Sequence, residues 1–252
     1  MSFDVSADAY GRFIGRYSEP LARQTAALLD LRPGQRALDV GCGPGALTAV
    51  LAEVLGAAGV VAVDPSESFV TAVRSRLPEV DVRRAPAEQL PFEDGGFDAT
   101  AAQLVVHFMD DPVAGLAEMR RVTRPGGPVV ACVWDYGSGG GPLSTFWATA
   151  REVDPGVEDE SERAGAREGH LRELFEQAGF RDVALPVLAV RSRFATFEEW
   201  WEPYTLGVGP AGEYVGGLAP AARDELRERC QARMPAAPFD VRAIAWAAVG
   251  YA

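Results

Sequence analysis

Short apolar segments alternate with helical segments between Gln35 and about Tyr136, and this alternation constrains the fold more than any other feature of the sequence. Strands separated by helices form a parallel sheet, because each helix carries the chain back across one face of the sheet to the start of the next strand. The pattern therefore predicts an α/β fold with a doubly wound sheet and helices on both faces. The expected strands are Ala37–Val40, Val60–Asp64, Asp81–Ala85, a run that begins at Phe97, and Pro128–Trp134.

The chain after Trp134 has a different pattern. Glycines at positions 137 and 139–141, followed by Pro142, predict a loop, and six acidic residues in the stretch Glu152–Glu162 predict a solvated segment. Further along, the expected elements are a helix over His170–Gly179, a sixth strand over Asp182–Arg193, helices over Phe197–Tyr204 and Pro220–Met234, and a last strand over Val241–Tyr251.

Composition excludes several classes of function. All 24 basic residues are Arg, so the chain has no phosphate-binding Walker lysine, no Schiff-base lysine and no lysine general base. The net charge of −12 disfavours nucleic acid as a partner, since binding to phosphates depends on clustered cations. The first residues do not form a signal peptide, and no apolar stretch is long enough to span a membrane. We therefore expect a cytoplasmic protein without a membrane partner.

The segment Leu38–Gly45, which reads LDVGCGPG, lies where the first strand turns into a helix. Glycines allow the backbone to approach a ligand closely, and the N-terminus of a helix offers free N–H groups. The glycines Gly41 and Gly43 fit the dinucleotide-binding fingerprint, and Asp64, 23 residues after Gly41, is well spaced to bind a ribose. The glycines alone therefore allow either NAD or another adenosine ligand.

Asp39 distinguishes these ligands. It places a carboxylate at the end of the first strand, where it would repel a pyrophosphate and attract an ammonium group. An amino-acid ligand fits this position better. With LDVGCGPG as its first motif, the sequence resembles the class I S-adenosylmethionine (SAM)-dependent methyltransferases, specifically the broad small-molecule group (methyltransferase type 11, UbiE-like). The resemblance extends from about Tyr10 to Trp134 and less closely to the end of the chain.

The resemblance implies SAM as the cofactor and S-adenosylhomocysteine as the product. It implies a Rossmann-like sheet of seven strands with the last strand antiparallel. Further motifs that match the family are VVAVDPSESFV, AEQLPFEDGGFD, QLVVHFMDD and, upstream of the glycines, YGRFIGRYSEPLA. The cofactor-binding residues that it implies are Tyr10, Arg16, Tyr17, Asp39, Gly41, Cys42, Gly43, Gly45, Asp64, Pro65, Phe69, Ala87, Glu88 and Gln103.

Each motif implies a role for its residues. Asp64 would bind both ribose hydroxyls, and Pro65 and Phe69 would pack near the adenine. Ala87 and Glu88 would lie beside the adenine, Gln103 near the methionine part, and the side chains of Tyr10, Arg16 and Tyr17 would close over the cofactor. The sequence departs from the family at Pro86, where the family has an Asp that accepts a hydrogen bond from the adenine amino group.

Methyl transfer from a sulfonium needs alignment and exclusion of water more than it needs a base, so the catalytic residues are not predicted. His107 is the candidate base, since it lies just past the fourth strand, although its apolar neighbours Val106 and Phe108 favour a packing role. Cys42, Cys132 and Cys230 form no CxxC pair, so no metal site is expected.

We expect one domain over residues 1–252, with a SAM-binding core at about 10–136. A loop and acidic insertion is expected at about 137–170. A helical lid is expected at about 194–240, between strands six and seven, where aromatic residues could cover an apolar or planar substrate.

The predicted activity is transfer of a methyl group from SAM to a small-molecule acceptor, mainly by proximity and alignment. One alternative is a SAM-binding protein without catalysis. Another is an NAD(P)-dependent oxidoreductase, which Asp39 and the absence of a Tyr-x-x-x-Lys pair disfavour. The acceptor atom and the oligomeric state are not predicted.

Overall fold

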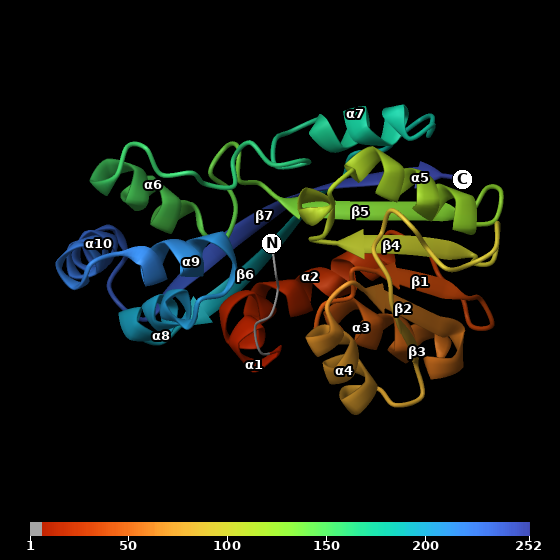
Figure 1. The fold of residues 1–252 in the computed structure, drawn as a ribbon, viewed down its shortest axis with the longest axis horizontal. Helices are drawn as coiled ribbons and strands as arrows, with labels where there is room; N and C mark the ends of the chain where they lie inside the picture. The colour runs from red at the N-terminus through yellow and green to blue at the C-terminus, as the bar shows by residue number, and fades with distance from the viewer. Residues whose placement is uncertain (1–6) are drawn as a thin grey trace.

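A sheet of seven strands crosses the molecule, with the order β3-β2-β1-β4-β5-β7-β6 (Figure 1). The computed structural model describes residues 7–252, so the first six residues of the predicted domain lie outside the described part. Strands β1 to β5 are parallel, and β7 is antiparallel to both β5 and β6. The predicted fold class and the antiparallel last strand are thus confirmed. The strands are β1 (Ala37–Val40), β2 (Val60–Asp64), β3 (Asp81–Arg84), β4 (Ala99–Gln103), β5 (Pro128–Trp134), β6 (Val187–Phe194) and β7 (Phe239–Tyr251).

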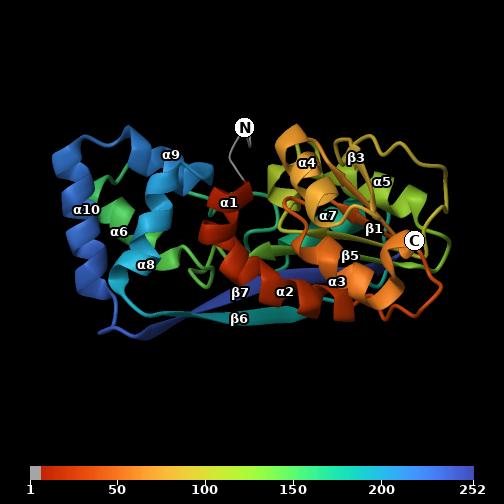
Figure 2. The same cartoon turned by 90° about the horizontal axis from the view of Figure 1, so that it is seen from below.

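Helices cover both faces of the sheet (Figure 2). The apolar faces of α2, α3 and α4 pack with β1 and β2 in one buried cluster, and those of α5 and α7 pack on the opposite face in another. These helices are α2 (Arg16–Ala27), α3 (Ala46–Leu55), α4 (Glu67–Arg76), α5 (Pro112–Val122) and α7 (His170–Gln177), and α1 (Ala7–Tyr10) leads into α2 through the short turn η1 (Gly11–Gly15).

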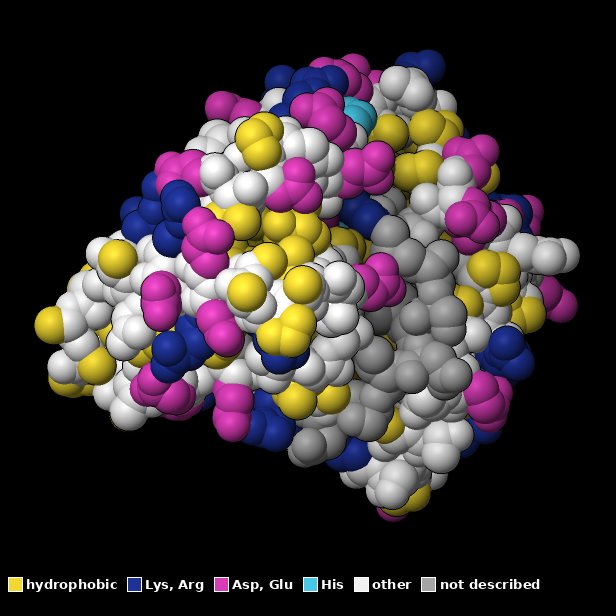
Figure 3. All heavy atoms as spheres, turned by 60° about the vertical axis from the view of Figure 1, so that its left-hand side comes forward, with side chains coloured by type: hydrophobic (Ala, Val, Ile, Leu, Met, Phe, Trp, Pro, Cys, Tyr) yellow, Lys and Arg dark blue, Asp and Glu magenta, His cyan; other side chains and the backbone are white. Residues whose placement is uncertain are grey.

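The predicted lid is a packed helical layer at one end of the sheet, beside the long strands β6 and β7 (Figure 2). Its helices are α8 (Phe197–Trp201), η4 (Glu202–Leu206), α9 (Gly209–Gly217) and α10 (Pro220–Arg233), together with α6 (Ser144–Val153) from the predicted insertion. Trp200 and Trp201 are both buried, and Phe146 of α6 stacks on Tyr204 at 4.4 Å between ring centroids. The aromatic residues therefore form the core of this layer. On its outer face, side chains of both charges alternate with small apolar patches (Figure 3).

Two expectations for this half of the chain were wrong, and two of its helices were not expected. The expected helices included neither α6, inside the predicted insertion, nor α9, in a glycine-rich part of the predicted lid. The sixth strand is continuous only from Val187, because Pro186 has no N–H for the ladder, although Ala184 still pairs with Val249 of β7. The acidic stretch is not wholly solvated, since Glu160 is buried inside the helical layer.

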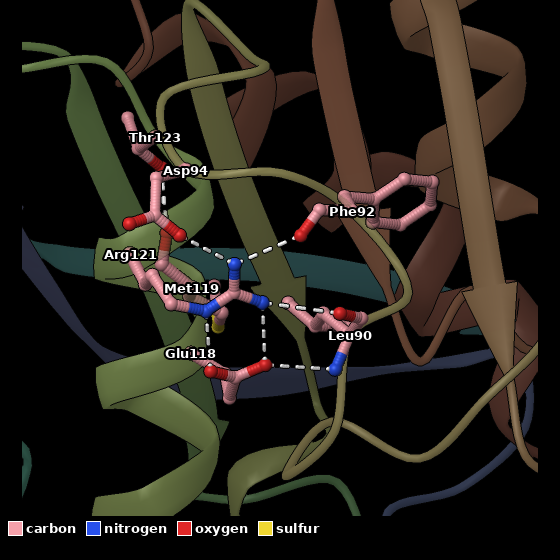
Figure 4. A network of polar contacts seen from close by, with 7 residues as sticks. All are labelled: Leu90, Phe92, Asp94, Glu118, Met119, Arg121 and Thr123. Atoms are coloured by element: carbon pink, nitrogen blue, oxygen red, sulfur yellow. Dashed lines mark hydrogen bonds and ion pairs between the residues drawn. The ribbon is translucent and has the colours of Figure 1, made fainter.

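Arg121 of α5 fixes the loop between β3 and β4 (Figure 4). Its guanidinium donates to both carboxylate oxygens of Glu118, to Asp94, and to the carbonyl oxygens of Leu90 and Phe92 at 2.6–3.1 Å. Glu118 in turn accepts a hydrogen bond from the Leu90 N–H at 2.9 Å. This network secures the loop that carries Ala87 and Glu88.

Arg121→Ala is expected to lower the free energy of unfolding by about 2 kcal/mol, because it leaves the carbonyl oxygens of the loop without their charged donor. Urea denaturation measures this loss. Arg229→Ala is the matched control, since Arg229 pairs only with Glu225 on exposed α10 and should cost less than about 0.5 kcal/mol. Equal losses for the two variants would show that the network does not hold the loop.

Among the described residues, no helix is long and apolar enough to cross a membrane. In the same part of the chain, no group of His, Cys, Asp and Glu side chains is placed to hold a metal ion.

Candidate cofactor site

The glycine turn after β1 has a backbone that only glycine adopts easily. Gly41, Gly43 and Gly45 all have positive φ angles, of 68°, 52° and 90°. A Cβ atom on Gly41 would lie 2.5 Å from the γ carbons of Val105, so the loop after β4 closes directly on the turn. The N–H groups of Gly41 and Cys42 both donate to the Val63 carbonyl oxygen, which ties the turn to β2.

Asp64, at the end of β2, is held by two backbone donors. The Gly43 N–H and the Ser66 N–H each donate to one of its carboxylate oxygens at 2.8 Å. Burial raises the pKa of this carboxyl, and the two hydrogen bonds oppose that shift. The side chain therefore joins the glycine turn to the start of α4 in a fixed orientation.

Asp39 and Gln103 lie on neighbouring strands, β1 and β4, and each presents an acceptor that has no partner among the described residues. Thr48 donates to Asp39 Oδ2 at 2.6 Å, while Asp39 Oδ1 is buried and unpaired. Gln103 Nε2 donates to the Ser18 carbonyl oxygen at 3.0 Å, while Gln103 Oε1 is also buried and unpaired. Burial raises the pKa of Asp39 to about 7. Two unpaired acceptors at one edge of the sheet fit a ligand that brings donors, such as an ammonium group.

These residues surround a cleft of about 310 Å³ at the carboxyl ends of the strands. This is the edge where ligands bind in open α/β sheets, and the volume is typical of a small-molecule site. Tyr10 packs edge-to-face on Phe69 at 5.5 Å along one side of the cleft. Of the predicted cofactor-binding residues, those that line it are Tyr10, Asp39, Gly41, Cys42, Gly43, Asp64, Pro65, Phe69, Ala87, Glu88 and Gln103.

Arg16, Tyr17 and Gly45 lie outside the lining of this cleft. Arg16 pairs with Glu199 of α8 at 2.6 Å and lies over the Phe194 ring, so it links α2 to the helical layer. Tyr17 is buried against Trp134 and Phe194, and Gly45 precedes α3 as its N-cap. The side chains of Arg16 and Tyr17 point towards β6 and not into the cleft.

Several further residues line the cleft and were not among the predicted site residues. Ser18 lines it through α2, and Val105, Phe108, Met109 and Asp110 line it from the segment after β4. The motif QLVVHFMDD contained the signal for this segment, since whatever follows a strand at this edge faces the ligand. Pro86 also lines the cleft.

Glu88 also links two of the loops that border the cleft. Its Oε1 accepts from the Asp110 N–H at 2.8 Å, which fixes the loop after β4 against the loop after β3.

A second, smaller chamber of about 40 Å³ adjoins the cleft. Tyr10, Leu104 and Phe108 line both spaces. His107 lines the chamber and not the cleft, is buried against Phe108, and its Nδ1 has no partner within the described part of the chain. Burial and the nearby Arg163 lower the pKa of His107 to about 3, so the imidazole is neutral. Its predicted packing role fits this burial, and its role as a base is not tested by the geometry.

The profile of the methyltransferase domain family matches residues 38–131. This stretch carries the glycine turn, Asp64 and Gln103. Over these residues the chain is similar to methyltransferase domains. The demethylmenaquinone methyltransferase of Beutenbergia cavernae is 41% identical to the chain over 108 residues, which is 43% of the chain and 44% of that relative. The chain thus spans less than half the length of this curated relative.

Solved structures extend the likeness to the whole fold. A putative methyltransferase from Bacillus halodurans has a TM-score of 0.60 at 18% identity. The superposition covers 91% of this chain and 97% of that protein. The phosphoethanolamine N-methyltransferase 2 of Haemonchus contortus was solved with S-adenosylhomocysteine. Its TM-score is 0.55 at 18% identity, and the superposition covers 100% of this chain and 61% of that enzyme. The helical layer therefore belongs to the same fold as the methyltransferase domain.

Proposed function

We propose that this chain transfers a methyl group from SAM to a small-molecule acceptor. The observation that carries the proposal is the pair of unpaired buried acceptors, Asp39 Oδ1 and Gln103 Oε1, at the carboxyl ends of β1 and β4. The α-ammonium group of SAM supplies the donors that both need. The pyrophosphate of NAD(P) brings only negative charge to this place, which disfavours the oxidoreductase alternative.

Different residues of the cleft would bind different parts of SAM. Asp39 and Gln103 would bind the methionine end, and Asp64, fixed by two backbone N–H groups, would bind the ribose hydroxyls. Phe69 and Ala87 would pack against the adenine. SAM supplies an electrophilic methyl group on a cationic sulfur. The chain would align an acceptor with this methyl group and exclude water, which are the main requirements of an in-line displacement.

The acceptor is part of the proposal. Relatives named demethylmenaquinone methyltransferases support a small-molecule acceptor. The family profile ends at residue 131, before α6 to α10, and these helices would contribute to the acceptor specificity of this chain. The cytoplasmic location and the absence of a nucleic-acid partner remain predictions from the sequence.

Asp64→Ala is expected to weaken SAM binding by about 1–3 kcal/mol, roughly 5- to 150-fold, because the ribose hydroxyls lose their acceptor. Calorimetric titration with SAM measures the dissociation constant. Asp81→Ala is the matched control, since Asp81 lies at the start of β3, away from the cleft, and pairs with Arg83. An Asp64→Ala variant that binds SAM as tightly as the control would exclude the ribose assignment.

The activity itself is tested by incubating the chain with methyl-labelled SAM and a pool of small cell metabolites. We expect label to appear in one or a few compounds together with S-adenosylhomocysteine. A chain that binds SAM and labels nothing is a SAM-binding protein without catalysis, and this result would overturn the proposed activity.

A further inference from the structure

The chamber beside the cofactor cleft combines aromatic walls with buried polar groups that no structural role accounts for. Phe13, Phe108, Trp134 and Tyr136 form much of its wall. Two residues of the wall, His107 and Trp134, each have a buried ring nitrogen, Nδ1 and Nε1, that finds no partner among residues 7–252. Buried polar atoms are nearly always paired, so one acceptor and one donor here point to a polar ligand group.

Glu160 is the one carboxyl among the residues that line the chamber. It is 2% exposed, although it belongs to the acidic stretch 152–162. The Trp147 Nε1–H donates to its Oε2 at 3.2 Å, and Tyr136 lines the same chamber. A buried carboxylate is costly unless it is paired or has a function. Among the described residues Glu160 forms no ion pair within 4 Å, and the positive charge of Arg163 acts on it from a longer distance.

Tyr10, Leu104 and Phe108 form the junction between the chamber and the cofactor cleft. An acceptor group at this junction would have the methyl donor on the cleft side and Glu160 on the chamber side. The chamber, at about 40 Å³, holds roughly three water molecules, so it admits the polar end of an acceptor or a single relaying water, but not a ring. The ring of an acceptor would stay against Tyr10 and Phe108.

We propose that Glu160 takes the proton from the acceptor, and that the acceptor is an uncharged phenol whose hydroxyl group lies at this junction. The inference rests on the proposed methyltransferase function. In the reaction, the phenol oxygen forms a bond to the methyl carbon as the carbon–sulfur bond of SAM breaks, and the sulfur keeps that electron pair. The phenol proton passes to the Glu160 carboxylate, directly or through one water, and then to solvent. The products are an aryl methyl ether and S-adenosylhomocysteine.

The electrostatics of the chamber support this role. Burial raises the pKa of Glu160 to about 7, so the carboxylate form is available near neutral pH and is basic enough to accept a proton from a phenol. The neighbouring groups whose pKa is shifted titrate away from neutrality. The pKa is lowered for His107 and Asp159, raised for Tyr10, Tyr136 and Tyr204, and Arg163 is a permanent cation.

The test measures methyl transfer to two phenol probes, 1-naphthol and p-cresol, at saturating SAM, with cyclohexanol as a non-acidic probe. We expect transfer to a phenol and none to cyclohexanol. Glu160→Gln should lower kcat by about 100-fold, with KM and the SAM dissociation constant changed by less than about threefold. Glu160→Asp should restore part of kcat. Glu158→Gln, an exposed acid two residues away, is the matched control and should leave kcat unchanged.

The pH profile separates a proton acceptor from a structural carboxyl. The wild-type kcat should fall as the pH drops through about 7, because the carboxylate becomes protonated, and Glu160→Gln should lack this limb. Asp39 also titrates near pH 7, but its titration affects SAM binding and disappears from kcat once SAM is saturating. If Glu160→Gln does not fold, the presence or absence of the fall in wild-type kcat below about pH 7 still tests the role of Glu160.

A Glu160→Gln variant with the wild-type kcat and the same acid limb would overturn the role of Glu160, as would a wild-type profile without this limb. A wild-type chain that binds SAM and labels other metabolites, but neither phenol, would overturn the acceptor class. A chain that labels no compound of any kind instead contradicts the proposed methyltransferase function.

Discussion

Asp39→Asn is expected to make the ligand-free chain more stable and, at the same time, to weaken SAM binding. Asp39 is 1% exposed, and its pKa is raised from 3.8 to about 7. The unfolded chain therefore ionises this group at a lower pH than the folded chain does. The protonated Asp39 carboxyl therefore contributes stability that is fully present below about pH 4 and is lost as the pH rises to about 7. Asn is never charged, so the variant avoids this loss.

The expected gain at pH 8 is about 2 kcal/mol in the free energy of unfolding, less than the full pKa shift implies because the Asn amide also needs partners in the buried site. Urea denaturation at pH 8 and at pH 5 measures it, and the gain should be less than half as large at pH 5. SAM binding should weaken by roughly 10- to 100-fold, since the ligand ammonium loses its charged partner. Asp240→Asn, on the exposed part of β7, should change neither quantity. An Asp39→Asn variant that keeps wild-type affinity would contradict the ammonium assignment.

Gly41→Ala is expected to lower the free energy of unfolding by about 2–5 kcal/mol and to reduce SAM binding below detection. The new Cβ would require an unfavourable positive φ and would lie 2.5 Å from both γ carbons of Val105. Val105 lines the cleft and is stiff, so the turn or the cleft must distort to make room.

The control for Gly41→Ala is Gly126→Ala, in the turn before β5. Gly126 has a similar φ of 74°, but a Cβ there meets no atom within 4 Å. This variant carries the backbone strain without the crowding, so it should cost about 1–2 kcal/mol and leave SAM binding intact. Thermal or urea unfolding and calorimetry on both variants separate the two effects. If Gly41→Ala behaves like Gly126→Ala, the close approach of Val105 does not shape the cleft.

The parallel half of the sheet could be predicted closely from the sequence. The bounds of β1, β2 and β5 agree with the predicted strands to the residue, because each is a short apolar run between clear breaks. The residues that define each of these strands lie within or next to the strand itself. The motif order also placed Asp39, Asp64 and Gln103 on strand ends, and the parallel arrangement brings those ends to one edge.

The helical layer could not be predicted in the same detail, because its structure depends on contacts between distant segments. The segment that forms α9 is rich in glycine, and its burial depends on packing within the aromatic cluster. Glu160 looks solvated in the sequence, since its neighbours are acidic, yet Trp147 and Tyr136 enclose it. Arg16 lies in a family motif and still pairs with Glu199, which is 183 residues away.

The central claim is that the cleft at the carboxyl ends of β1, β2 and β4 is built for SAM. The most direct test is calorimetric titration of the wild-type chain with SAM, S-adenosylhomocysteine and NADH in turn. We expect SAM and S-adenosylhomocysteine to bind at one site per chain, with NADH showing no heat of binding. Binding of NADH alone would contradict the account.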